Sequence, residues 1–261
     1  MLPGFVVCLV RIRVTVVYAA IVTGVTMALL FLSPQIHDRV IRHASTNLHN
    51  LSHGHIGTLL GSAFVVDAGP IYLWLPGLMC LMAVAELYWS SGRLVLAFSV
   101  GHVGATLLVA LGLTAAIERG WLPGSLTRAT DVGMSYGAAA VLGSLTAAIP
   151  RRWRPAWVGW WLAVGIVAIV LGGDFTDVGH AVALGLGMLV STRFGEAGML
   201  SRVGVALLGV AASFGFLLLA NSGPSLAVPT ACGLLGAAVL GVAAPRMTHG
   251  YAVESSSGHR L

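Results

Sequence analysis

Lysine is absent from this sequence of 261 residues, and charged residues make up only 9% of it. An ordinary soluble domain carries about 25% charged residues, so the composition excludes that class of protein. All fourteen basic residues are arginines, and they are spread along the chain. The net charge of +5 therefore forms no basic tract, and we expect no nucleic-acid partner.

Cysteine is also scarce. Cys8, Cys80 and Cys232 lie far apart in apolar surroundings. Their number is odd, and their spacing is not that of zinc ligands, so they predict neither a disulfide framework nor a zinc site. We expect no cofactor.

Hydrophobic residues make up 57% of the chain and recur in runs of about 20 residues. Such a run is long enough to cross a hydrocarbon core of about 30 Å. The sequence therefore predicts an all-α polytopic membrane protein, with the lipid bilayer as its surroundings. We expect helices over about residues 14–32, 70–89, 94–117, 132–149, 156–171, 175–192, 203–220 and 225–244. The apolar segment 56–66 is too short to span, which predicts a re-entrant or interfacial piece.

The arginines predict the orientation of these helices. With the N-terminus inside, ten of the fourteen arginines fall in loops on the inner side and four on the outer side. Loops rich in arginine and lysine stay in the cytoplasm. We therefore expect both termini to be cytoplasmic.

Two of the predicted helices carry a serine and a histidine near their outer ends. Ser135 lies about four residues into the segment 132–149, and His180 lies about five residues into the segment 175–192. Both would sit roughly 5–8 Å below their helix starts. A histidine at the depth of a serine can take the proton of its hydroxyl. Because a histidine inside a membrane is costly unless it is paired or reached by water, His180 is a functional candidate.

Other interpretations of these residues stay open. Ser135 and His180 can both be ordinary polar residues in packed helices. Residues 133–137 also fit the Gly-x-Ser-x-Gly elbow of α/β-hydrolases, but that elbow needs a preceding strand in a soluble sheet. His102, inside the third predicted helix, is expected to be a packed polar residue. Asp174 and Asp177 either orient His180 or simply belong to a solvent-exposed loop.

Three motifs together indicate a family. Gly133-Met134-Ser135 opens the fourth predicted helix, Gly179-His180 lies in the sixth, and a glutamate followed by Gly92-Arg93 joins the second and third. Over about residues 14–193 the chain resembles the rhomboid intramembrane serine proteases. The lysine-free composition is typical of divergent rhomboid-like proteins from high-GC bacteria such as actinobacteria.

The resemblance implies a fold, an activity and a cellular location. It implies a six-helix core with two added C-terminal helices, located in a bacterial plasma membrane. It implies a serine endopeptidase that cleaves the transmembrane segment of another protein near the outer face, with Ser135 as nucleophile and His180 as general base. Domain boundaries follow: a rhomboid-like core over 1–195, added transmembrane helices over 196–245, and a polar disordered tail over 246–261.

The chain departs from the family pattern at two points. Tyr136 follows the serine where rhomboids have glycine, and Gly137 comes one residue later. The second helix lacks the histidine and asparagine that rhomboids use to stabilise the oxyanion. Losing one such donor can cost 10²–10³ in rate. Candidates for this supporting role are the Ser135 backbone N–H together with Gly133, Tyr136, Gly137, Asn50, His53 and His55.

Two other functions remain open. The first is a catalytically inactive rhomboid-like protein that binds transmembrane clients. The second is a metal- or cofactor-binding membrane protein organised by the histidine-rich first loop. His49 and His53 can share a helical face there, with His55 close by, although nothing fixes a third or fourth ligand.

Overall fold

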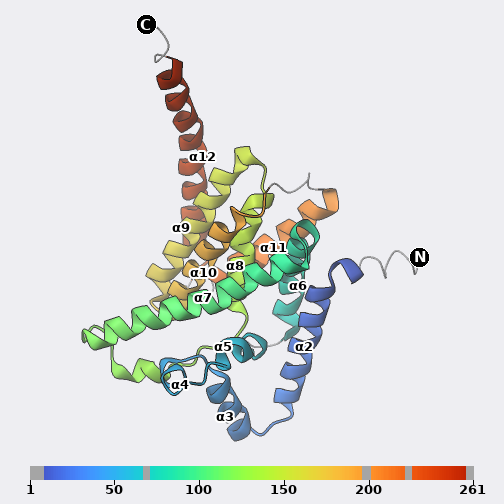
Figure 1. Cartoon of the computed structure of the whole chain (residues 1–261), viewed down its shortest axis with the longest axis vertical. Coiled ribbons are helices and arrows are strands. Elements are labelled where there is room, and N and C mark those ends of the chain that lie inside the picture. The colour runs from blue at the N-terminus through green and yellow to red at the C-terminus, as the bar shows by residue number, and fades with distance from the viewer. Residues whose placement is uncertain (1–8, 67–70, 196–200, 221–224, 257–261) are drawn as a thin grey trace.

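The computed structural model describes residues 9–66, 71–195, 201–220 and 225–256, with side chains up to residue 243. Within these ranges the chain is helical and contains no strand. The helices of the bundle are α2 (Arg13–Leu30), α6 (Ile71–Trp89), α7 (Ser91–Glu118), α8 (Ser135–Ser144), α9 (Arg154–Gly172), α10 (Phe175–Ser191), α11 (Arg202–Ala220) and α12 (Ala227–Ser256). The predicted all-α polytopic class and its eight helices are confirmed (Figure 1).

Five of these helices are long and apolar enough to cross a membrane: α2, α6, α7, α9 with the turn before it, and α11. Helix α10 and residues 227–243 of α12 are shorter apolar helices. The start predicted for the second helix, Pro70, lies outside the described residues. The tail predicted after Pro245 continues α12 as far as Ser256, and residues 257–261 again lie outside the described part.

Helix α8 forms the centre of the bundle. It has ten residues and continues into the 3-10 turn η3 (Leu145–Ala148), so it is shorter than a full span. Residues 138–142 are fully buried beneath α6, α7, α10 and α11. Because protein rather than lipid surrounds α8, its small side chains set how closely the neighbouring helices approach.

Glycines bring α8 and α10 into backbone contact. A Cβ at Gly143 would meet the Leu184 carbonyl, and a Cβ at Gly187 would meet the Ala140 carbonyl. Gly137 packs in the same way against the ring of Phe98 on α7. Gly137, Gly143 and Gly187 therefore allow α8 to approach α7 and α10 closely.

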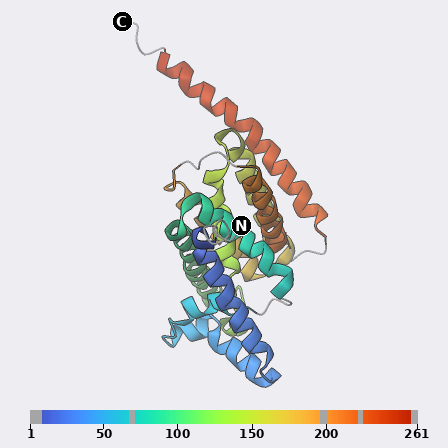
Figure 2. The same cartoon turned by 90° about the vertical axis from the view of Figure 1, so that its right-hand side faces the viewer.

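The two C-terminal helices join the bundle differently. Helix α11 packs on α6, where Phe214 fills the space above Gly77. Helix α12 packs on α9, where Gly159 and Gly236 bring the two backbones together. The C-terminal end of α12 extends away from the bundle, on the side opposite the first loop (Figures 1 and 2).

A buried carboxylate joins α2, α6 and α7 near the arginine-rich end of α2. Glu86 accepts hydrogen bonds from the backbone N–H groups of Val14 (3.0 Å) and Thr15 (2.9 Å). It also accepts from the hydroxyls of Thr15 (2.8 Å) and Ser91 (2.7 Å). These bonds satisfy backbone donors at the start of α2 that have no partner within the helix. The glutamate noted before Gly92 thus fixes the junction of three helices.

The long first loop folds into short helices at one end of the bundle. These are α3 (Pro34–Ala44), α4 (Leu48–Ser52), α5 (Thr58–Gly61) and the 3-10 turn η1 (Ser62–Phe64). The hydroxyl of Tyr18 on α2 donates a 2.6 Å hydrogen bond to the Ala63 carbonyl, which anchors the last of them. The segment 56–66 therefore folds as short turns that do not span.

Candidate functional site

Ser135 is the first residue of α8 and is partly buried. The helix was expected to begin near Val132, but it begins three residues later because the backbone turns sharply at Gly133. Gly133 has a φ of +119°, a conformation that residues with a side chain rarely adopt, and a Cβ there would meet open space. Gly133 is thus required by the turn that leads into Ser135.

The first loop holds the segment that leads into Ser135. The Thr46 N–H donates to the Asp131 carbonyl at 2.9 Å, and the Ser45 hydroxyl accepts from the Asp131 N–H at 2.8 Å. The Gly133 N–H donates to the Ser62 carbonyl at 2.9 Å. These three bonds fix both ends of the turn, so the position of Ser135 depends on the fold of the loop.

Side chains extend this network to α7. The Thr46 hydroxyl lies 2.8 Å from the Ser62 hydroxyl, and Ser62 Oγ lies 3.1 Å from His102 Nε2. All three residues are buried. His102 is therefore a packed polar residue that positions the loop, as its place within the third helix predicted.

His180 lies on α10, in the second turn after the N-cap residue Asp174. Both ring nitrogens are buried, and neither has a hydrogen-bond partner among the described residues. Buried polar groups are nearly always paired, so an orphaned imidazole indicates a site that is completed by another molecule or by a small movement. Ser135 and His180 form no hydrogen bond with each other in this structure.

Tyr136 brings the two helix ends together. Its ring meets the imidazole of His180 edge to face, with the ring centroids 5.3 Å apart. Gly179 lies directly against the same ring, which leaves no room for a side chain at that position. The Tyr136 hydroxyl is buried and also lacks a partner among the described residues. The structure thus places Ser135 one residue from a contact with His180, at the meeting point of α8 and α10.

The other candidates from the first loop lie elsewhere. Asn50 uses its side-chain amide to donate to the carbonyls of Arg42 (3.0 Å) and Ser45 (2.8 Å), so it shapes the loop. His53 and His55 are exposed on and after α4, which packs against the 3-10 turn η2 (Gly124–Arg128). No contact of these side chains with Tyr136 or His180 is seen in the described part of the chain.

The histidines proposed as metal ligands form a pair rather than a site. The rings of His49 and His53 stand 4.3 Å apart, and His53 Nδ1 lies 2.7 Å from the His49 carbonyl. Among the described residues, no group of three or more histidines, cysteines, aspartates or glutamates is arranged to hold a metal ion. The described geometry therefore gives no support to a metal centre in this loop.

An acidic residue, Asp131, lies in the connection that leads into Ser135. Burial, together with the nearby carboxylate of Asp174, raises the pKa of Asp131 to about 7. Both residues lie in the connections that precede α8 and α10. The site is therefore bordered by a carboxyl group that changes its charge near neutral pH.

Sequence reasoning did not identify Ser45, Thr46 and Ser62 as supports of the site. Their hydrogen bonds join positions up to 86 residues apart, and no local sequence pattern indicates them.

Comparisons with known proteins add the family. Comparison with curated proteins and with solved structures gave no match. The family model of the rhomboid-like proteins matches residues 9–194, which run from the start of the bundle to just beyond α10. The match contains both Ser135 and His180 and leaves out α11 and α12. The chain therefore belongs to the family of rhomboid-like proteins.

Proposed function

We propose that this protein is an intramembrane serine protease that uses Ser135 and His180 to cleave a transmembrane segment of another protein. The observation that supports this most directly is His180: a buried imidazole with two unpartnered nitrogens, beside the first turn of α8. A general base needs an acceptor nitrogen that no other group occupies. Family membership makes a serine at this helix start the natural partner.

The chemistry would proceed through an acyl-enzyme. Ser135 Oγ attacks the scissile carbonyl carbon while His180 takes the hydroxyl proton. The tetrahedral intermediate then collapses: the carbon–nitrogen bond breaks, and His180 gives its proton to the leaving amine. Water entering from the side of Asp131 and Asp174 hydrolyses the ester and releases Ser135. The side chain of Ser135 must first rotate or shift toward the imidazole, because the two are not hydrogen-bonded in this structure.

Backbone groups offer the best stabilisation of the oxyanion. The first N–H groups of a helix have no partner within it, and they carry the positive end of the helix dipole. Ser135 occupies this position in α8. The carbonyl oxygen of a substrate attacked by Ser135 Oγ would become the oxyanion, and it would lie next to these donors. This arrangement would replace the side-chain donors that the second helix lacks.

A fluorophosphonate probe tests the activated serine. Purified full-length protein in detergent is labelled as wild type, as Ser135→Ala and as His180→Ala. We expect labelling of the wild type and at least a hundredfold less in both variants, because the probe needs the nucleophile and the base together. The matched control is Ser144→Ala, which removes a buried hydroxyl from the same helix. Ser144 bonds only the Val141 carbonyl within its own turn, so this variant should label like the wild type.

A wild type that is folded but unlabelled would contradict the protease proposal. Folding is checked for each protein by a cooperative thermal transition and a single size-exclusion peak. Labelling that persists in Ser135→Ala would show that another residue reacts with the probe, which would equally contradict the assignment of Ser135.

One observation favours a second function, a rhomboid-like protein that binds transmembrane clients without cutting them. The ring of Tyr136 packs against both Gly179 and His180, and the imidazole has no hydrogen bond to Ser135. In this function Tyr136 would close the site permanently. Probe labelling of Tyr136→Gly distinguishes the two functions. If the protein is a protease, this variant should be labelled as strongly as the wild type or more strongly. If it is a client-binding module, neither the wild type nor the variant should be labelled.

We also propose that the protein lies in a bacterial plasma membrane with both termini in the cytoplasm. The support is the ten-to-four distribution of arginines between alternate loops. Alkaline phosphatase fused after residue 261 should then be inactive, and green fluorescent protein fused there should be fluorescent. The opposite pair of results would invert the orientation and place Ser135 near the cytoplasmic face.

A further inference from the structure

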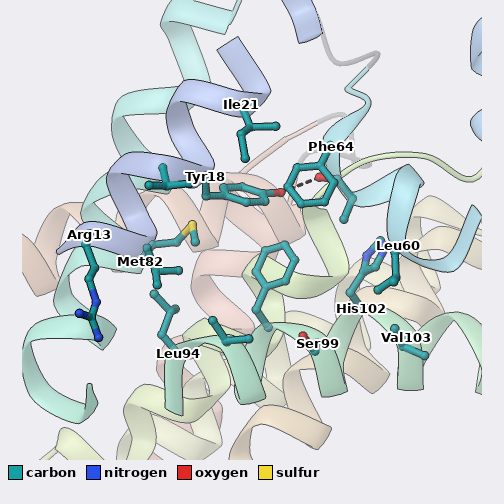
Figure 3. Close-up of a pocket in the computed structure, with 15 residues that line it drawn as sticks. Arg13, Tyr18, Ile21, Leu60, Phe64, Met82, Leu94, Ser99, His102 and Val103 are labelled. Carbon is teal, nitrogen blue, oxygen red and sulfur yellow. Dashed lines mark hydrogen bonds between the residues drawn. The ribbon is translucent and has the colours of Figure 1, made fainter. Parts of the chain in front are cut away.

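An apolar groove of about 460 Å³ runs between α2 and α7 on the flank of the bundle. Its lining includes Tyr18, Met82 and Phe98. Leu60 and Phe64 of the first loop close its far end (Figure 3). Arg13 and His102 lie at opposite ends of the row of lining residues. Val17 and Ile21 are exposed along its rim, so the groove opens toward the surrounding membrane.

The length of this groove matches one leaflet of a bilayer. Along α7 the lining extends from Leu94 to Val103, which is roughly 14 Å at the helical rise of 1.5 Å per residue. Half of a hydrocarbon core is about 15 Å thick. The groove begins where α2 and α7 begin and ends beneath the first loop. An acyl chain of one leaflet therefore fits the length of the groove, whereas a membrane-spanning helix would project well beyond its closed end.

The open end of the groove adjoins a polar hollow of about 590 Å³ that also contains Arg13. Arg11, Ser90 and Ser91 line this hollow, together with Glu86. The Glu86 carboxylate is already occupied by the four hydrogen bonds that join the helices. Arg13 donates to Ser91 at 3.3 Å and forms no ion pair with a described carboxylate. Two arginines against one carboxylate leave the hollow with a net positive charge.

We propose that the two hollows form one binding site for an anionic phospholipid. Its phosphate would lie at Arg11 and Arg13, and one of its acyl chains would occupy the groove between α2 and α7. The charge specifies an anionic headgroup, since basic pockets at membrane faces bind such lipids. The apolar length specifies a lipid chain rather than a free phosphate. The lipid belongs to the leaflet at which α2 begins, which the arginine distribution predicts to be cytoplasmic. This site lies apart from Ser135 and does not depend on the proposed protease activity.

Native mass spectrometry of delipidated full-length protein tests both halves of the site. The probes are phosphatidylglycerol and phosphatidylcholine with identical acyl chains, added in competition. For the wild type we expect one tightly held phosphatidylglycerol, favoured over phosphatidylcholine by about tenfold, because each nearby arginine contributes to binding a negative headgroup. The double variant Arg11→Gln/Arg13→Gln should bind both lipids equally, and Arg11→Lys/Arg13→Lys should keep the preference.

A side chain that fills the groove tests the acyl-chain half. Val95→Trp places an indole in the groove from α7 and should weaken binding of both lipids by at least fivefold. Its matched control is Leu96→Trp, the next residue on the same helix, which is outside the groove lining and has similar exposure (49% against 46%). Val17→Trp fills the groove from α2 and replaces Val95→Trp if that variant does not fold.

Three results would overturn the proposal. The first is equal binding of the two lipids by the wild type. The second is a phosphatidylglycerol preference that survives in Arg11→Gln/Arg13→Gln, which would place the headgroup elsewhere. The third is equal binding by the Val95→Trp and Leu96→Trp variants, which would mean that the lipid coats the surface without entering the groove.

Discussion

The ring of Tyr136 and the imidazole of His180 meet edge to face across the seam between α8 and α10. The contact is possible because Gly179 has no side chain to occupy the same space. A glycine on one helix, an aromatic residue on the other and the histidine beside them thus form one packed unit. A larger residue at position 179 would collide with the Tyr136 ring and disturb this unit.

Substituting Gly179 by alanine tests this packing. The added Cβ would collide with the Tyr136 ring, so we expect the free energy of unfolding to fall by about 1–3 kcal/mol. Gly185→Ala is the matched control on the same helix, where a Cβ meets open space and alanine favours the helix. Thermal unfolding in one detergent compares them. Equal melting temperatures for the two variants would mean that the Tyr136 ring moves aside without cost.

Gly133→Ala tests the turn before Ser135. An alanine cannot hold a φ of +119° without strain of about 1–3 kcal/mol, so the turn should relax and move Ser135. We expect fluorophosphonate labelling to fall at least tenfold while most of the fold survives. Gly57→Ala is the control in the first loop, since its Cβ also meets open space but its φ is negative. Undiminished labelling of Gly133→Ala would show that the turn does not position the serine.

Glu86→Gln tests the junction of α2, α6 and α7. The amide would present N–H groups to backbone and hydroxyl donors that now bond a carboxylate. Leaving buried donors unpaired costs about 1–3 kcal/mol, so we expect a clearly lower melting temperature. Glu118→Gln, at the exposed end of α7, should unfold like the wild type. If Glu86→Gln matches that control, the carboxylate is not needed at the junction.

Asp131 predicts a pH dependence of stability. Its pKa is raised from 3.8 to about 7 by burial and by Asp174, so the folded protein keeps a proton that the unfolded chain releases between about pH 4 and 7. Stability should therefore fall as pH rises through this range and level off above it. Asp131→Asn should remove that part of the slope and raise the melting temperature at pH 8 by a few degrees.

The control for that experiment is Asp38→Asn, at an exposed position in α3. This variant should keep the wild-type slope between pH 4 and 7. A slope that is unchanged in Asp131→Asn would assign the titration to a different carboxyl group.

Much of the fold could be predicted because apolar runs end at recognisable residues. The helix expected at 203–220 is observed as Arg202–Ala220, and the helix expected at 175–192 as Phe175–Ser191. Arginines, glycines and prolines interrupt the runs where water or a turn is needed. The depth of burial of α8 also follows from its small side chains, which suit close contact on every side.

The details of the site could not be predicted in the same way. The bond from Thr46 to Asp131 joins two loops that are distant in sequence, and neither residue differs from an ordinary loop residue. Asn50 was a plausible oxyanion donor by type and side of the membrane, but its amide serves the loop's own carbonyls. The sequence showed that Tyr136 departs from the rhomboid pattern. The position of its ring against His180 depends on the rotation of two helices about their axes, which the sequence does not give.

The close contact of α8 with α10 limits how the protein can move. Gly143 and Gly187 place each backbone against a carbonyl of the other helix, so neither helix can slide or tilt alone without collision. The pair must behave as one rigid block, because two backbones packed without intervening side chains cannot move relative to each other without steric overlap. A polypeptide that reaches Ser135 therefore has to be admitted by elements around this block, such as the first loop or α6. Any gating motion would belong to the periphery of the molecule, while Ser135 and His180 move together.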